Sequence, residues 1–347
     1  YVWTEAEIDH ALGPRAVLFK SHYDVSAAGN WEGRTILNRS GSPELADAET
    51  ERELAECRAL LLRVRDGRVR PGWDDKVLAD WNGLMIAGLA NAGLVFGRAD
   101  WVARAAAAFD FIRDRMSDAD GRLWHSWRAG RAQHAANIDD YANLARAALA
   151  LHEAIGEAGY LSRVQDWLAV LDRHYRDAEA GGYFFAADDT KGLIARAKTA
   201  ADSAVPAGNG TLVGVLARLA LLTGDDDYRR RAEAIVETFS GEAGRNFFPL
   251  ATLLNNAEFL AKPLQIAIVG NPADTAFTGL RRAAYSVSLP NRVVETYPPD
   301  AVLPEGHPAH GKGLVGGRAA AYLCEGPVCS LPLTEPAALR EALEKVR

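Results

Sequence analysis

Cysteine is scarce in this chain. Its 347 residues include only Cys57, Cys324 and Cys329, which are too few for the disulfide framework of a small secreted protein. A secretory signal sequence is also missing, and so is an apolar run of the ~20 residues that a membrane helix needs. We therefore predict a cytoplasmic protein without a membrane partner.

The chain also lacks a basic excess and the common cofactor motifs. It has 39 Lys and Arg against 46 Asp and Glu, a net charge of -7, which argues against a nucleic-acid partner. We find no phosphate loop, no dinucleotide fingerprint and no nucleophile elbow, and we predict no cofactor. His307 and His310 resemble a pair of metal ligands, but Pro308 favours a rigid turn and no further ligands follow closely. We predict no metal site.

The pairing of the cysteines stays open. Cys324 and Cys329 flank a Gly-Pro pair at a spacing that differs from the CxxC of redox motifs. A disulfide, a pair of metal ligands and two free thiols are all compatible with this spacing. Cys57 falls in a charged amphipathic helix predicted over 43–65, where we expect it to act as a small buried hydrophobe.

Helical stretches without charged residues, by contrast, are abundant. The stretch 83–96 has no charged residue, and Asn91 is its only strongly polar side chain. A helix that is apolar on every face is buried all round or lies in a membrane, and this one is short for a membrane span and diluted by Gly and Ala. We interpret it as the inner helix of a helical protein, with a polar and aromatic cluster over 72–82 at its amino end.

This plan recurs about every 60 residues, as an apolar helix, an amphipathic helix and a turn of Gly and aromatic residues. The apolar helices are predicted over 81–96, 141–155 and 209–222, and the amphipathic helices over 100–116, 161–175 and 226–239. Stacked αα-hairpins explain such a repeat. Because the inner helices lose their charge, we predict that the array closes into an α/α toroid of five or six hairpins. An open solenoid is the alternative.

Beyond Lys262 the pattern changes. Short buried strands are predicted over 264–270, 291–297 and 319–324, with helices over 272–284 and 336–346. The predicted fold class is therefore mainly α: an α/α toroid (six-hairpin barrel) over 1–262, with a small C-terminal α/β appendage over 263–347. At the other end of the chain, Thr4 and Glu7 form a capping-box pattern that begins the first short helix.

Polar side chains precede each inner helix. If these helices run parallel around a toroid, their amino ends meet at one mouth, where free N–H groups suit anionic or hydroxyl-rich ligands. Carboxylates beside flat aromatic faces are typical of sugar sites, and two carboxylates flanking a glycosidic bond act as general acid and base. We predict Asp75 and Asp140 as catalytic residues, because each is the second acid of a pair and one cap per helix suffices. The predicted substrate-binding residues are Asp74, Lys76, Trp81, Asn82, Trp124, Asp139, Tyr141, Tyr183, Lys198, Asp202 and Asn209. The alternative is that the Asp and Asn residues are helix N-caps only.

Six motifs occur in order along the chain. They are Tyr1–Thr4, Gly29–Gly33, Asp74–Ile86, Asp139–Ala142, Lys198 with Asp202 ahead of Pro206–Asn209, and Ala321–Cys324. Together they resemble the spermatogenesis-associated-protein type of thioredoxin-fused proteins. Complete members begin with a thioredoxin-like domain, which is absent here, and the start at Tyr1 rather than Met indicates a fragment or a processed product. The resemblance also implies a six-hairpin α/α toroid similar to N-acylglucosamine 2-epimerases and several glycosidases.

The resemblance points to carbohydrate chemistry. Sugar epimerases of this fold use paired histidines for proton transfer beside a sugar carbonyl, whereas the inner helices here start with Asp, Asn and Tyr, and His125 and His134 lie on loops. We therefore favour a carboxylate mechanism like that of toroid hydrolases over isomerisation. The predicted function is a carbohydrate-active toroid whose partners are a mono- or oligosaccharide ligand and the thioredoxin-like domain. The rival hypothesis is a non-catalytic binding or scaffold module, in which Cys324 and Cys329 exchange with that domain.

Overall fold

The chain divides into two compact units. The structure, a computed structural model, describes residues 1–303, 305, 307–326 and 328–346. The units are Tyr1–Asp74 and Asp75–Arg347. The domain boundary expected between residues 262 and 263 stays a prediction.

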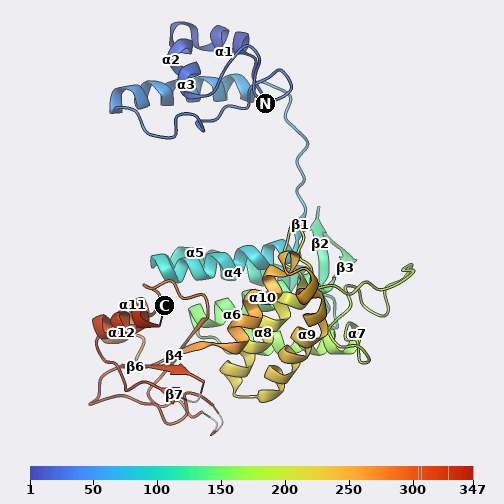
Figure 1. Cartoon of the computed structure of the whole chain (residues 1–347), viewed down its shortest axis with the longest axis vertical. Coiled ribbons are helices and arrows are strands. Elements are labelled where there is room, and N and C mark those ends of the chain that lie inside the picture. Colours follow the sequence, from blue (N-terminus) through green and yellow to red (C-terminus); the bar gives the residue numbers. More distant parts are fainter. Residues whose placement is uncertain (304, 306, 327, 347) are drawn as a thin grey trace. The chain divides into compact units, whose positions relative to one another are not determined.

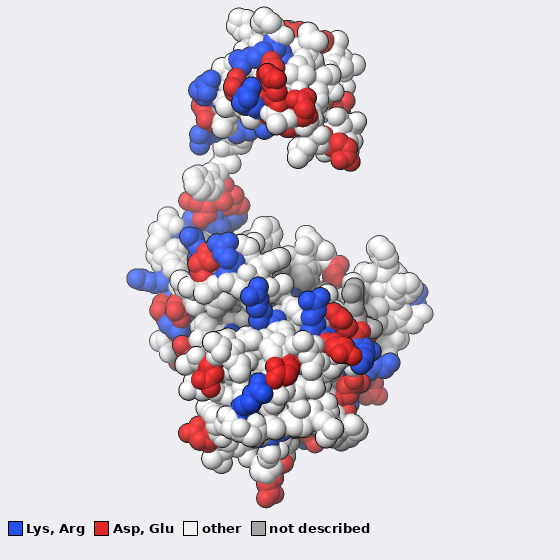
Figure 2. Space-filling view, turned by 90° about the vertical axis from the view of Figure 1, so that its left-hand side faces the viewer, with Lys and Arg blue, Asp and Glu red and all other residues white. Residues whose placement is uncertain are grey.

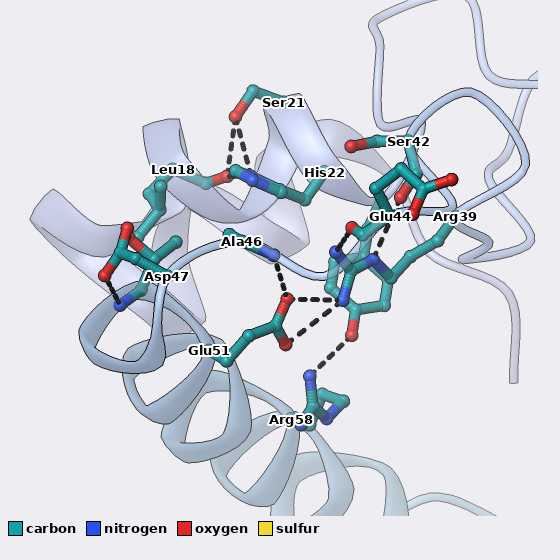
Figure 3. Close-up of polar contacts among 12 residues, drawn as sticks. Leu18, Ser21, His22, Arg39, Ser42, Glu44, Ala46, Asp47, Glu51 and Arg58 are labelled. Atoms are coloured by element: carbon teal, nitrogen blue, oxygen red, sulfur yellow. Dashed lines mark hydrogen bonds and ion pairs between the residues drawn. The ribbon is translucent and has the colours of Figure 1, made fainter.

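The smaller unit is a set of helices with a core of its own. It contains α1 (Glu5–Leu12), η1 (Gly13–Arg15), α2 (Ala16–His22) and α3 (Ala48–Asp66). The capping box of Thr4 and Glu7 at the start of α1 is confirmed, and Cys57 is fully buried in α3 as predicted. The Arg39 guanidinium ties the preceding loop to α3, because it donates to the Glu51 carboxylate at 2.8 Å (Figure 3).

The larger unit begins with three αα-hairpins and a further helix. Their bounds are α4 (Ala79–Phe96) with α5 (Ala99–Arg115), α6 (Ile138–Ile155) with α7 (Gly159–His174), α8 (Gly208–Thr223) with α9 (Asp226–Arg245), and, after η2 (Phe248–Leu250), α10 (Ala251–Ala261). The inner helices α4, α6, α8 and α10 each pack against the next in the series (Figure 1). This confirms the mainly helical fold class, with the hairpin arrangement expected of α/α toroids. The fourth inner helix, α10, lies beyond the three predicted repeats.

The inner helices differ in how deeply they are buried. Each of α4, α6 and α8 ends at a left-handed glycine (Gly97, Gly156 and Gly224), where a residue without Cβ terminates the helix at no steric cost. Most of α6 and α8 is buried. On α4, however, Met85 stays 63% exposed and Phe96 70% exposed, so this helix is not covered on every face.

A small antiparallel sheet lies beside the amino ends of α4 and α6. It contains β1 (Val77–Leu78), β2 (Trp124–Arg128) and β3 (Arg131–Ala135), in the order β1-β2-β3. Most of β2 thus falls where the sequence predicted the first turn of Gly and aromatic residues, after the amphipathic helix expected over 100–116. The two-residue turn Ala129–Gly130 has positive φ at both positions, which suits the twist of a tight hairpin.

The C-terminal segment forms the second sheet. Its order is β5-β4-β6-β7, with β4 (Leu264–Val269), β5 (Arg292–Tyr297), β6 (Ala320–Glu325) and β7 (Val328–Cys329). The helices α11 (Thr275–Ala284) and α12 (Pro336–Lys345) pack on each other and share an apolar core with the sheet. The strands and helices expected here are confirmed. Cys324 and Cys329 are paired residues of β6 and β7 and form a disulfide.

Two further observations agree with the amino-acid composition. On the face of the larger unit seen in Figure 2, Lys and Arg side chains are interspersed with Asp and Glu side chains. Among the described residues, no helix combines the length and apolarity that a membrane crossing requires.

Candidate acid–base site at the amino ends of the inner helices

Glycines allow the inner helices to approach closely at their amino ends. A Cβ added to Gly83 of α4 would lie 2.7 Å from the carbonyl carbon of Asn143 in α6. A Cβ added to Gly208 of α8 would lie 2.7 Å from a carboxylate oxygen of Asp139. The amino ends of α4, α6 and α8 therefore converge, as expected if their polar groups form one cluster.

Asp140 links three elements of this cluster. Its carboxylate is fully buried and accepts hydrogen bonds from the backbone N–H of Asp80 at 3.0 Å and that of Asn137 at 2.8 Å. It also accepts a hydrogen bond at 2.9 Å from Nδ1 of His125, which β2 carries to the start of α6. With these donors, the carboxylate has strong partners on α4, on α6 and on β2. Asp140 is thereby fixed in place and holds the His125 ring in one orientation.

The electrostatics of the cluster raise the basicity of His125. The hydrogen bond that His125 donates to Asp140 raises the pKa of His125, and burial raises the pKa of Asp80, with the Asp140 charge adding to that rise. The His125 side chain is 28% exposed, and none of the described residues bonds its Nε2 atom. An imidazole that is oriented through one nitrogen and accessible at the other is suited to accept and return a proton.

Asp139 faces a small cavity beside this cluster. Its Oδ1 accepts the Gly208 N–H at 2.6 Å, and burial raises the pKa of its carboxyl to about 6. The cavity has a volume of about 170 Å³, and Thr199, Ser203 and Asn209 line it together with Asp139. A carboxyl group with a pKa near 6 holds a proton for an appreciable fraction of the time near neutral pH, so it can act as an acid.

Other predicted binding residues make contacts within the protein. Asp202 accepts the N–H groups of Ala207 and Thr252, and the Asn209 side chain bonds both backbone groups of Tyr183. The Lys198 ammonium lies 2.6 Å from the Asp177 carboxylate. The hydroxyl groups are also engaged: that of Tyr141 accepts the Leu123 N–H, and that of Tyr183 donates to Asp172. These side chains position the loops around the inner helices.

The remaining predicted residues lie just before β1, in the first turn of α4 and on β2. Asp75 pairs with Arg128 at 2.5 Å at the exposed end of β2, outside the set of Asp80, His125, Asp139 and Asp140. Asp74 and Lys76 are exposed on either side of it, and Trp81 is more than half exposed. Asn82 donates to the Leu78 carbonyl, and Trp124 packs against the core of the larger unit. The structure thus gathers Asp139 and Asp140 into one cluster with Asp80 and His125, neither of which was among the predicted site residues.

Within the described part of the chain, two groups of side chains have the donors of a metal site. Asp80, His125 and Asp140 each offer a ligand atom within 4.8 Å of the others, and so do His174, Asp188 and Asp189. In the first group, Asp140 already accepts two backbone N–H groups, which compete with a metal for its lone pairs. Elsewhere, the ring nitrogens of His307 and His310 bond the carbonyl oxygens of Leu222 and Leu303, as expected of a structural turn.

No family model matches the chain, but homologues do. It is 30% identical to spermatogenesis-associated protein 20 of Rattus norvegicus and 29% identical to that of Homo sapiens, in each case over 99% of its length. It spans about half the length of these relatives, 49% of each. The resemblance noted in the sequence is therefore confirmed.

Solved toroids are structurally similar at low identity. A GH76 α-mannanase from Bacteroides thetaiotaomicron has a TM-score of 0.46 and 15% identity, covering 69% of this chain and 67% of its own. Cellobiose 2-epimerase from Bacillus thermoamylovorans has a TM-score of 0.43 and 10% identity, covering 74% of this chain and 66% of its own.

Proposed function

We propose that this homologue of spermatogenesis-associated protein 20 is a carbohydrate-active protein that binds a mono- or oligosaccharide at the amino ends of α4, α6 and α8. The observation that carries this proposal is the pair of His125 and Asp140, in which a buried carboxylate orients an imidazole whose other nitrogen remains accessible. In sugar isomerisation or epimerisation, a base removes the proton beside the carbonyl, and the electron pair moves onto the carbonyl oxygen. A proton is then returned to carbon. His125 is the group suited to this step.

Hydrolysis by two carboxylates has less support from the geometry. Asp139 can supply the acid, because its pKa of about 6 leaves it partly protonated. Asp140, however, is enclosed by three hydrogen-bond donors and has no exposed surface with which to meet a substrate. Proton transfer through His125, with Asp140 orienting it and Asp139 nearby, is therefore the mechanism that we favour.

A non-catalytic module is the second candidate, and one observation favours it. Asp140, Asp139 and Asp202 accept backbone N–H groups at the amino ends of α4, α8 and α10 respectively. Each carboxylate thus caps a neighbouring inner helix and stabilises the array whether or not a ligand binds. An assay of turnover, rather than of folding, separates the two functions.

The test measures exchange of carbon-bound hydrogen with solvent. Neutral sugars, amino sugars and uronates are first screened for thermal stabilisation of the full chain, and the binders are then incubated with it in D₂O and followed by NMR. We expect deuterium at the carbon beside the carbonyl, and a loss of about 100-fold or more in its rate in His125→Asn. The matched control is His134→Asn, which changes an exposed histidine of β3 in the same hairpin.

The outcomes distinguish the candidates. New reducing ends without deuterium incorporation would indicate hydrolysis and overturn the role of His125. A folded chain that binds no sugar and exchanges no hydrogen would favour the non-catalytic module.

A further inference from the structure

Charged and hydroxyl side chains also line the inner helices well beyond their amino ends. On α6, Asp139, Arg146 and Glu153 are spaced by seven residues, so they lie along one face, with Arg146 about 10 Å from Asp139 along the helix axis. On α8, Thr211 and Arg218 have the same spacing. These residues lie deeper than the cluster of His125 and Asp140.

A cavity of about 340 Å³ lies between these helices and α10, which is large enough for a small ligand. Its polar lining includes Arg146, Thr211, Arg218, Thr252, Asn255 and Asn256. A second cavity of about 200 Å³ shares Arg146 and Arg218 and extends to Tyr285. Guanidinium, amide and hydroxyl groups thus dominate the polar lining.

Three of these groups have no partner among the residues that the structure describes. The Arg146 side chain is exposed, and its guanidinium makes no hydrogen bond or ion pair there. The Thr211 hydroxyl is unpartnered although the residue is only 2% exposed, and so is the Tyr285 hydroxyl at 6% exposure. The exposed Arg146 guanidinium can therefore meet a ligand in the cavity, whereas the two hydroxyl oxygens are buried beneath the cavity surface.

Among the described residues, no carboxylate around the cavity forms an ion pair with Arg146. Arg218 lies 3.2 Å from the Glu153 carboxylate and also donates to the carbonyl of Arg292, so its charge is balanced. Glu258 is exposed at the rim and forms no ion pair with either cavity arginine within the described parts of the chain. One positive charge therefore remains for a ligand to neutralise.

We propose that this cavity binds the oxyanion group of a small hydroxylated ligand, with Arg146 contacting the anion and the asparagine amides contacting hydroxyl groups. A sugar acid, through its carboxylate, and a sugar phosphate, through its ester, share this chemistry. The site is separate from the acid–base cluster and does not depend on turnover at His125.

Calorimetric titration of the full chain tests this site. The probes are glucose, glucuronate, glucose 6-phosphate and inorganic phosphate. We expect glucuronate or glucose 6-phosphate to bind about tenfold or more tightly than glucose, because a charge-assisted hydrogen bond contributes that much. Preference for glucuronate identifies the carboxylate as the anion, and preference for glucose 6-phosphate identifies the ester.

Matched variants locate the binding. Arg146→Gln should weaken the preferred anion about tenfold with an unchanged melting temperature, since Arg146 has no ion pair to lose among the described residues. Arg104→Gln removes the same charge from an exposed position on α5 and should have no effect.

Three results would overturn the proposal. Equal affinity for glucose and the anionic sugars would exclude anion recognition, and unchanged binding in Arg146→Gln would place the anion elsewhere. Inorganic phosphate binding as tightly as glucose 6-phosphate would exclude recognition of the hydroxyl groups. Deuterium exchange through His125 is a separate readout, so its failure and the failure of this site are distinguishable.

Discussion

At the scale of single residues, Glu295 has a strongly raised pKa, and this has a simple consequence for stability. It is 5% exposed in β5, accepts a hydrogen bond from Gln265 at 2.7 Å, and lies against Tyr297 and His307. Burial raises its pKa from 4.5 to about 7. Because the folded pKa exceeds the unfolded one, its contribution to stability is fully present below pH 4.5 and is lost as the pH rises through about 7.

Glu295→Gln should therefore stabilise the chain at pH 8 relative to pH 5. The difference between variant and parent in the free energy of unfolding should change by roughly 3 kcal/mol between these two pH values. Urea unfolding at both pH values measures this difference. Glu344→Gln, in an exposed pair on α12, is the control and should show no pH-dependent change. Parallel pH profiles for parent and Glu295→Gln would contradict the prediction.

Asp140 gives a second prediction at this scale. Asp140→Ala removes the acceptor for two backbone N–H groups and for His125, which should cost about 2–4 kcal/mol of unfolding free energy. It should also lower the pKa of His125, because the Asp140 hydrogen bond is the main cause of its rise. NMR titration of the His125 ring measures that pKa, and urea unfolding measures the cost. An unchanged His125 titration would show that another group sets its pKa.

The sequence predicted some site residues and missed others for identifiable reasons. The adjacent acids Asp139 and Asp140 are visible because they stand at the start of an apolar helix. His125 comes close to Asp140 only because β2 and β3 form a hairpin, and the alternation of Trp-His-Ser-Trp was the available signal for that strand. The sequence also does not reveal which N–H group a carboxylate accepts, so the capping role of Asp202 could not be distinguished from ligand binding.

At the scale of elements, the contact of α4 with α6 depends on a missing side chain. A methyl group at Gly83 would meet the Asn143 backbone at 2.7 Å, whereas a methyl group at Gly88 of the same helix meets nothing within 4 Å. Gly83→Ala should therefore destabilise the chain by about 1–3 kcal/mol through overpacking. Gly88→Ala should stabilise it by up to about 1 kcal/mol through helix propensity. Urea unfolding of both variants tests this, and equal effects would exclude a close helix contact at Gly83.

Hydrophobic periodicity predicted the positions of the helices better than it predicted which residues lie on their inward faces. The predicted inner helices 81–96, 141–155 and 209–222 overlap α4, α6 and α8 almost completely. The interpretation that these helices lose their charge overlooked Arg146 and Glu153 in α6 and Arg218 in α8. Such an exception is itself a signal, because a charge on the inward face of a helix needs a partner or a cavity.

At the scale of the whole molecule, a charged network joins the C-terminal sheet to the inner helices. The Glu153 carboxylate of α6 pairs with Arg218 of α8 and accepts the Val294 N–H of β5, while Arg218 donates to the Arg292 carbonyl of β5. The sequence indicated the sheet through its buried strands. It gave no sign of this attachment, because the partners lie more than 60 residues apart.

Removing the Glu153 carboxylate from this network should destabilise the sheet and the inner helices together. Glu153→Ala leaves Arg218 without its ion pair and the Val294 N–H without its acceptor, which should cost about 2–4 kcal/mol of unfolding free energy. Because one network spans the sheet and the helices of the larger unit, far-UV and near-UV circular dichroism should report a single urea transition for that unit, at a lower midpoint. Glu233→Ala, which breaks an exposed pair with Arg229 on α9, should cost less than about 0.5 kcal/mol. Two separate transitions within the larger unit of the parent chain, apart from any transition of the unit Tyr1–Asp74, would instead mean that the sheet and the helix array fold independently and that the network does not couple them.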